Sequence, residues 1–190
     1  NYHANLHNGA NAGGKLDLYN YNSTDGNSTA VSFHNSNGLS IARILGVNIS
    51  HSSRNGALVF MTSTANYPTE KVRIDSSGRV LIGTTTEGHA SADDLTIYNS
   101  GNGGITIRTG TTSNGAIFFS DATSGAAEYD GWVQYNHGTA PYMIFGTAGN
   151  TRLRIDSSGH MGLGVTPSAW PTNNDYKGCL LYTSPSPRDS

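Results

Sequence analysis

The residues best suited to chemistry in this 190-residue chain are the acidic and aromatic side chains between positions 128 and 135. Successive side chains of a β-strand point to opposite faces, so alternation would place Tyr129, Val133 and Tyr135 on one face. The opposite face would then carry a polar set that consists of Glu128, Asp130, Trp132 and Gln134. An exposed indole beside carboxylate and amide groups suits a sugar, whose apolar face can stack while its hydroxyl groups form hydrogen bonds. This polar set is our candidate for contacts with a glycan; the interpretation that we favour for Trp132 itself is packing against a neighbouring subunit.

Two other carboxylates are the most regularly placed in the chain, because each begins an Asp-Ser-Ser-Gly run. The first run is Asp75, Ser76, Ser77 and Gly78, and the second is Asp156, Ser157, Ser158 and Gly159. An Asp side chain accepts hydrogen bonds from backbone N–H groups two or three residues further on, and Gly tolerates the positive φ that many turns require. We interpret both runs as structural turns and predict no catalytic residue in the chain.

The remaining acidic pairs and histidines favour structural roles. Asp93 and Asp94 are adjacent, whereas the two carboxylates of a glycosidase face each other across the scissile bond. Adjacent carboxylates are more typical of a loop. His3 and His7 have the i, i+4 spacing of helical zinc ligands, but their Asn- and Gly-rich surroundings disfavour a helix. We therefore predict no metal site and no cofactor.

The segments that flank the two Asp-Ser-Ser-Gly runs have the period-2 alternation of half-buried strands. Residues 72–74 and 153–155 read apolar–Arg–apolar before each turn, and residues 80–83 and 161–164 continue with apolar residues and glycine after it. Gly78 and Gly159 would end the loop of a tight hairpin. Each copy therefore predicts a β-hairpin that positions its Asp at the turn.

A larger repeat contains these hairpins. The segment at residues 16–20 resembles the segment at residues 95–99, and the hairpins recur at nearly the same offset, close to 80 positions. Two markers at one offset predict a tandem unit of about 80 residues. Unit one would span residues 16–94 and unit two residues 95–173, with residues 1–15 as the end of a preceding unit.

The end of the chain has a different character. Residues 179–190, which include the single Cys, resemble an in-frame translation of a transposase sequencing adapter, and we expect them to lie outside the fold. Residues 174–178 would then begin a truncated downstream region. Because the sequence starts at Asn1 without Met, we expect a fragment of a longer reading frame.

Composition narrows the fold class. Hydrophobic residues make up 35% of the chain and charged residues 13%, so the high charge of most disordered chains is missing. Helix-forming residues at 3.6-residue spacing are also missing, which favours an all-β fold of short strands and many turns. The net charge of −2 predicts no nucleic-acid partner. No apolar run approaches the roughly 20 residues that span a bilayer, so we predict no membrane insertion.

The second hairpin carries a resemblance to a known family. The segment 154–167 reads Arg-Ile-Asp-Ser-Ser-Gly, then a glycine after four further residues, then Val-Thr-Pro. It resembles the recurrent shaft motif of bacteriophage tail fibres and tail spikes, of the kind found upstream of an endosialidase-type intramolecular chaperone domain. The resemblance covers residues 70–86 and 151–170. It implies an elongated homotrimer in the virion that acts at the host cell surface, with a cleavable chaperone after Trp170.

Burial also favours assembly. A unit of about 80 residues with so little apolar surface excludes little water by itself, and its edge strands expose unpaired backbone groups. Identical chains wound around one axis would bury the apolar surface and pair the exposed strand edges, whether there are two, three or four chains. The resemblance to tail fibres and spikes implies three. We therefore predict an elongated tandem β-repeat completed by homotrimerisation. In a single chain Ile41, Leu45 and Ile144 should be incompletely covered.

The resulting functional hypothesis is a non-enzymatic structural segment of a phage tail fibre or spike that binds a host cell-surface glycan as its receptor. Two alternatives remain. The chain could be part of a glycan-depolymerising tail spike enzyme, which needs a groove with opposed carboxylates. It could also be a repeat of a bacterial surface adhesin.

Overall fold

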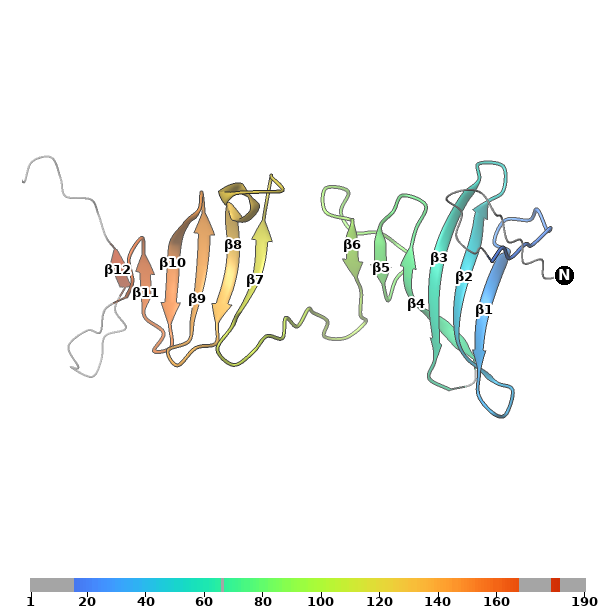
Figure 1. The fold of residues 1–190 in the computed structure, drawn as a ribbon, viewed down its shortest axis with the longest axis horizontal. Coiled ribbons are helices and arrows are strands. Elements are labelled where there is room, and N and C mark those ends of the chain that lie inside the picture. The colour runs from blue at the N-terminus through green and yellow to red at the C-terminus, as the bar shows by residue number, and fades with distance from the viewer. Residues whose placement is uncertain (1–15, 66, 168–178, 182–190) are drawn as a thin grey trace, which may run out of the picture. The chain divides into compact units, whose positions relative to one another are not determined.

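The computed structural model describes residues 16–65, 67–167 and 179–181, and in them the chain forms twelve strands and one short 3-10 helix (Figure 1). The predicted all-β class is confirmed. The chain divides into two units, residues 1–104 and residues 105–190, and each unit has its own six-stranded sheet. This division lies between Gly104 and Ile105, whereas the sequence repeat suggested a boundary between residues 94 and 95.

The first sheet keeps its strands in chain order. They are β1 (Ser28–His34), β2 (Ser40–Ser50), β3 (Asn55–Ser63), β4 (Pro68–Ile74), β5 (Val80–Ile82) and β6 (Leu95–Ile97). The first five pair antiparallel through turns, whereas β6 pairs parallel to β5 after the connection 83–94. A parallel pair needs such a crossover connection. Residues 95–97, which the repeat analysis assigned to unit two, are thus the last strand of the first sheet.

The second sheet has the same strand order. Its elements are β7 (Asn114–Phe119), the 3-10 helix η1 (Ala126–Tyr129), β8 (Gly131–Asn136), β9 (Tyr142–Thr147), β10 (Asn150–Asp156), β11 (Met161–Leu163) and β12 (Cys179–Leu181). Neighbouring strands pair antiparallel, except that β12 is parallel to β11. The strand β12 lies in the segment that resembles an adapter translation. The expectation that this segment lies outside the fold is wrong for residues 179–181, which pair with β11. Residues 1–15 and 174–178 lie outside the described part of the chain.

Each sheet forms a single layer within its own unit in the described part of the chain (Figure 1). Among the described hydrophobic residues, four are buried: Ala57, Val59, Leu81 and Ile144. Ile41 is 48% exposed and Leu45 is half-buried, as predicted. The prediction for Ile144 is wrong, because this residue lies on a central strand between Gln134 and Arg154, whose long side chains can cover it.

Candidate functional site

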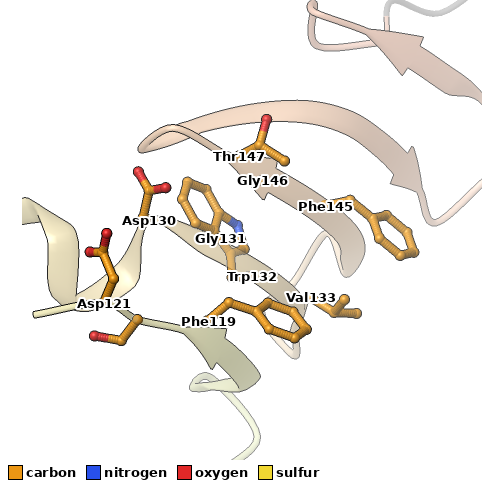
Figure 2. Close-up of a pocket in the computed structure, with 10 residues that line it drawn as sticks. Phe119, Asp121, Asp130, Gly131, Trp132, Val133, Phe145, Gly146 and Thr147 are labelled. Carbon is orange, nitrogen blue, oxygen red and sulfur yellow. The ribbon is translucent and has the colours of Figure 1, made fainter. Parts of the chain in front are cut away.

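An open cavity of about 500 Å³ lies on the second sheet where β7, β8 and β9 meet the loop 120–130 (Figure 2). It combines aromatic side chains with carboxylate and hydroxyl groups. Its lining residues are Phe119, Ser120, Asp121, Asp130, Gly131, Trp132, Val133, Phe145, Gly146 and Thr147. This cavity is the strongest candidate for a binding site in the described residues.

Strand register brings the apolar part of the lining together. Phe119 pairs with Gly131, and Val133 pairs with Phe145 across the next pair of strands. Alternation then puts the three apolar side chains on one face of the sheet, and Figure 2 shows them projecting to the same side. Gly131 has no side chain, and Phe119 lies over it: a Cβ on Gly131 would be 3.4 Å from Phe119 Cβ and 3.5 Å from its Cδ2. The apolar wall therefore comes from three consecutive strands, β7, β8 and β9.

Trp132 points to the opposite face of β8 from its neighbour Val133. It pairs with Gly146, and a Cβ added to Gly146 would overlap the indole ring, so the ring covers this glycine (Figure 2). The indole Nε1–H is buried and has no hydrogen-bond partner among the described residues. Trp132 is half-buried by its own sheet and does not stand free as a stacking platform.

The predicted polar set does not share one strand face. Glu128 lies in η1, and Asp130 follows that helix as its C-cap, so the period-2 alternation predicted for residues 128–135 is wrong for residues 128–130 and holds only from Gly131 onward. Gly125 has φ 76° and turns the chain into the helix, and pairing with β7 starts only at Gly131. Trp132 and Gln134 do share a face of β8.

Short hydrogen bonds hold the loop that carries the two carboxylates of the cavity. The Ser120 hydroxyl donates to the carbonyl of Ala122 at 2.7 Å, and the N–H of Gly149 donates to the carbonyl of Asp130 at 3.1 Å. Figure 2 shows Asp121 and Asp130 on the side of the Trp132 indole, whereas the Phe119 and Phe145 rings project to the other side. Sequence reasoning missed Asp121 because its proximity to Asp130 depends on this loop.

The cavity suits a polyhydroxylated ring better than a purely apolar ligand. The Trp132 indole is the aromatic group on the side of the two carboxylates, and the Asp121 and Asp130 carboxylates can accept hydrogen bonds from the hydroxyl groups of a sugar. The Thr147 hydroxyl can both donate and accept. Of the four residues predicted to contact a glycan, Asp130 and Trp132 line this cavity.

The first Asp-Ser-Ser-Gly run forms the turn between β4 and β5. Asp75 Oδ1 accepts hydrogen bonds from the N–H groups of Ser77 (2.8 Å) and Arg79 (3.0 Å), and Gly78 has φ 85°. Asp75 Oδ2 accepts from Arg79 Nε at 2.7 Å. Burial raises the pKa of Asp75, but the hydrogen bonds from Arg79 and Ser77 outweigh it and lower the pKa below its ordinary value.

The second run forms the turn between β10 and β11 with the same backbone pattern. Asp156 Oδ1 accepts from the N–H groups of Ser158 (2.9 Å) and His160 (2.9 Å), and Gly159 has φ 82°. Asp156 Oδ2 lies 3.1 Å from His160 Nδ1. Burial again opposes the shift, yet the hydrogen bonds from His160 and Ser158 lower the pKa of Asp156.

Searches for a metal site, for a membrane-spanning helix and for related proteins identify no further functional feature in the described residues. In residues 16–65 and 67–167 no group of three or more His, Cys, Asp or Glu side chains is arranged to hold a metal ion. No helix in the described residues has the length and hydropathy of a membrane span. The chain matches no protein-family model and no curated protein.

Proposed function

We propose that this chain is a structural and receptor-binding segment of a phage tail fibre or tail spike, in which three identical chains form a β-rod. The rod would belong to the virion and act at the host cell surface. The observation that carries the proposal is the uncovered apolar surface of the two single-layer sheets. The shaft motif at the two hairpins supplies the link to tail fibres and spikes.

The extent of this surface argues against a monomer as the working state. Large apolar side chains on every long strand of the first sheet are exposed, among them Phe33 (49%) and Ile41 (48%). Soluble monomers rarely expose contiguous apolar patches of more than a few hundred Å². When identical chains cover these faces, the apolar side chains are removed from water. The stability of each folded chain then depends on assembly.

Local similarity of the two sheets supports the tandem repeat. In both sheets a bulge precedes the hairpin, at Lys71 in the first and at Arg152 in the second. The N–H of Gly83 donates to the carbonyl of Lys71 at 3.0 Å, and the N–H of Gly164 donates to that of Arg152 at 2.9 Å. Such matching irregularities are features of a repeated unit rather than of strand pairing in general.

The receptor site in this proposal is the cavity on the second sheet. The two carboxylates and the Trp132 indole are the groups that a neutral sugar would contact, whereas Phe119, Val133 and Phe145 belong to the apolar surface that the trimer would cover. Single contacts of this kind are weak, and three copies on one rod would gain affinity through effective concentration.

The assembly is tested by the mass of the full 190-residue chain in solution, measured by light scattering coupled to size exclusion. We expect three times the 20.0 kDa of one chain. Ile44→Asp should reduce the mass toward that of a monomer, because Ile44 lies between the exposed Val31 and Phe60 and the substitution places a charge on that apolar face. Ser36→Asp, on an exposed turn of the same unit, is the matched control and should leave the trimer intact. A monomeric, stably folded wild-type chain would overturn the proposal.

The two carboxylates of the cavity also favour one alternative, a glycan-depolymerising spike. The test is release of new reducing ends from bacterial surface glycans. The non-enzymatic proposal predicts binding without release, and Asp121→Asn and Asp130→Asn should weaken binding. Release that both variants abolish would replace the proposal with the enzyme. An adhesin repeat would instead be indicated by a cell-wall anchor or a secretion signal in the longer reading frame.

A further inference from the structure

Two equivalent arginines have different environments in the two sheets. Arg73 of β4 lies opposite Val59, and its guanidinium pairs with Glu70 through Nε–Oε1 (2.8 Å) and Nη2–Oε2 (2.9 Å). Arg154 of β10 occupies the same place before the second turn and lies opposite Ile144. The residue three positions earlier, on the far side of the bulge, is Thr151 instead of Glu. The bidentate pair of the first sheet therefore has no counterpart.

Arg154 consequently has no carboxylate partner among the described residues. Its Nε–H is buried and has no hydrogen-bond partner there. An arginine side chain carries five N–H donors and a permanent charge, and its fork geometry matches a carboxylate or a phosphate. A half-buried guanidinium without an anion is an uncompensated charge that an anionic ligand would stabilise.

The guanidinium is nevertheless held in place. Its Cζ lies 3.7 Å from the centre of the Tyr142 ring, a cation–π contact that fixes the plane of the fork. Tyr142 pairs with Asp156 at the start of β9, and the equivalent position in the first sheet is the buried Ala57. In the second sheet Thr151 occupies the position of the neutralising Glu70, and Tyr142, at the position of Ala57, orients the arginine.

A cavity of about 200 Å³ adjoins this arginine. Its lining combines the cation with two threonines: Tyr142, Ile144, Thr151, Arg154, Gly164, Val165 and Thr166. Threonine hydroxyl groups can donate further hydrogen bonds to an anion. This volume accommodates a single carboxylate or phosphate group with a small part of the molecule that bears it.

We propose that Arg154, oriented by Tyr142 and assisted by Thr151, binds the carboxylate or phosphate group of a small anionic ligand. The anion accepts N–H hydrogen bonds from the guanidinium and a hydroxyl hydrogen bond from Thr151. The site is separate from the cavity at Phe119, and it does not depend on the assignment to a tail fibre.

The test is calorimetric titration of the full chain, in its purified oligomeric state, with four probes. Glucuronate and acetate present a carboxylate, inorganic phosphate presents a tetrahedral anion, and glucose is the neutral control. We expect saturable binding of the carboxylates or of phosphate, and no binding of glucose. The anion with the lower dissociation constant identifies the kind of group that the site binds. Glucuronate presents a planar carboxylate and phosphate a tetrahedral anion, so the comparison distinguishes the two shapes.

Three variants locate the binding. Arg154→Gln should weaken anion binding by about tenfold or more, a loss of the charge-assisted hydrogen bonds. Arg152→Gln is the matched control on the same strand, since Arg152 is exposed and bonds to Thr147 Oγ1 at 3.2 Å; binding should persist. Thr151→Glu should abolish binding with Arg154 still present, because it recreates the internal pair of Glu70 and Arg73.

Each of three results would overturn the proposal. The first is absence of saturable anion binding by the wild-type chain. The second is an equal loss in Arg152→Gln and Arg154→Gln, which would mean unspecific attraction to positive charge. The third is a change of oligomer mass in Arg154→Gln without anion binding in the wild type, which would place a carboxylate of a neighbouring copy at Arg154.

Discussion

The hairpin at Asp75 and the hairpin at Asp156 share their backbone hydrogen bonds but differ in the residue that follows the glycine. In each turn the N–H of the Asp donates to the carbonyl four residues on at 3.0 Å, and the N–H of the Gly donates to the carbonyl of the Asp at 3.0 Å. The following residue is Arg79 in the first hairpin and His160 in the second. Both bond to Oδ2 of their Asp.

The longer side chain gives the first hairpin additional connections. Arg79 Nη1 lies 3.0 Å from Asp93 and 3.5 Å from Glu87, both in the connection between β5 and β6. His160 pairs only with Asp156 within the described residues. The turn itself thus depends on Asp and Gly, whereas Arg79 additionally ties the first hairpin to the connection that precedes β6.

The largest effect is expected from Gly78→Val and Gly159→Val. Both glycines have positive φ, and a Cβ would meet no atom within 4 Å, so the cost is backbone strain alone. Each substitution should lower the free energy of unfolding by about 1–3 kcal/mol, measured by urea denaturation. Gly104→Val is the control, because its Cβ is also in open space and its φ is not positive. If the two substitutions lowered the free energy of unfolding by clearly different amounts, the two turns would not be structurally equivalent.

Asp75→Ala and Asp156→Ala should have the next largest effect, about 1 kcal/mol each. Each removes the acceptor for two backbone N–H groups and one side chain of its turn. Denaturation measures the loss, and glycan binding by the same variants should persist. An Asp→Ala variant that folds with wild-type stability yet no longer binds glycan would mean that these carboxylates are functional.

Acid should weaken both hairpins. Because the folded-state pKa of Asp75 and of Asp156 is lowered, each contributes stability above its unfolded pKa of about 3.9 and loses it as the pH falls through the folded value. The free energy of unfolding should therefore fall on acidification below about pH 4. The double variant Asp75→Asn with Asp156→Asn should show a shallower acid slope. An unchanged slope would contradict the role of the two carboxylates.

The smallest effect is expected from Glu70→Gln, which sharpens the contrast between Arg73 and Arg154. The pair that it breaks is partly exposed, with 17% and 25% of the two side chains accessible, so the loss should be about 0.5 kcal/mol. High salt should reduce this difference because it screens the pair. Thr151→Gln, at the equivalent position of the second sheet, should leave the stability unchanged.

The sequence by itself determined the all-β class and both hairpin turns. The turns could be predicted because their interactions span four residues: the Asp accepts from nearby N–H groups, and Gly78 and Gly159 adopt the positive φ. The partners Arg79 and Asp93 were missed, although a basic residue directly after the glycine was a visible signal. Their contact joins a turn to a crossover connection, which spacing does not reveal.

Only the tertiary structure decided which strands neighbour one another, and thereby where the candidate site lies. Pairing of Val80 with Leu95 moves the last strand of the first sheet away from its predicted unit. The register of β7, β8 and β9 gathers Phe119, Val133 and Phe145 into one wall, while η1 removes Glu128 from the predicted face. The physical reason is that strand pairing is made by backbone groups common to all residues, so its register depends on the packing of the whole sheet.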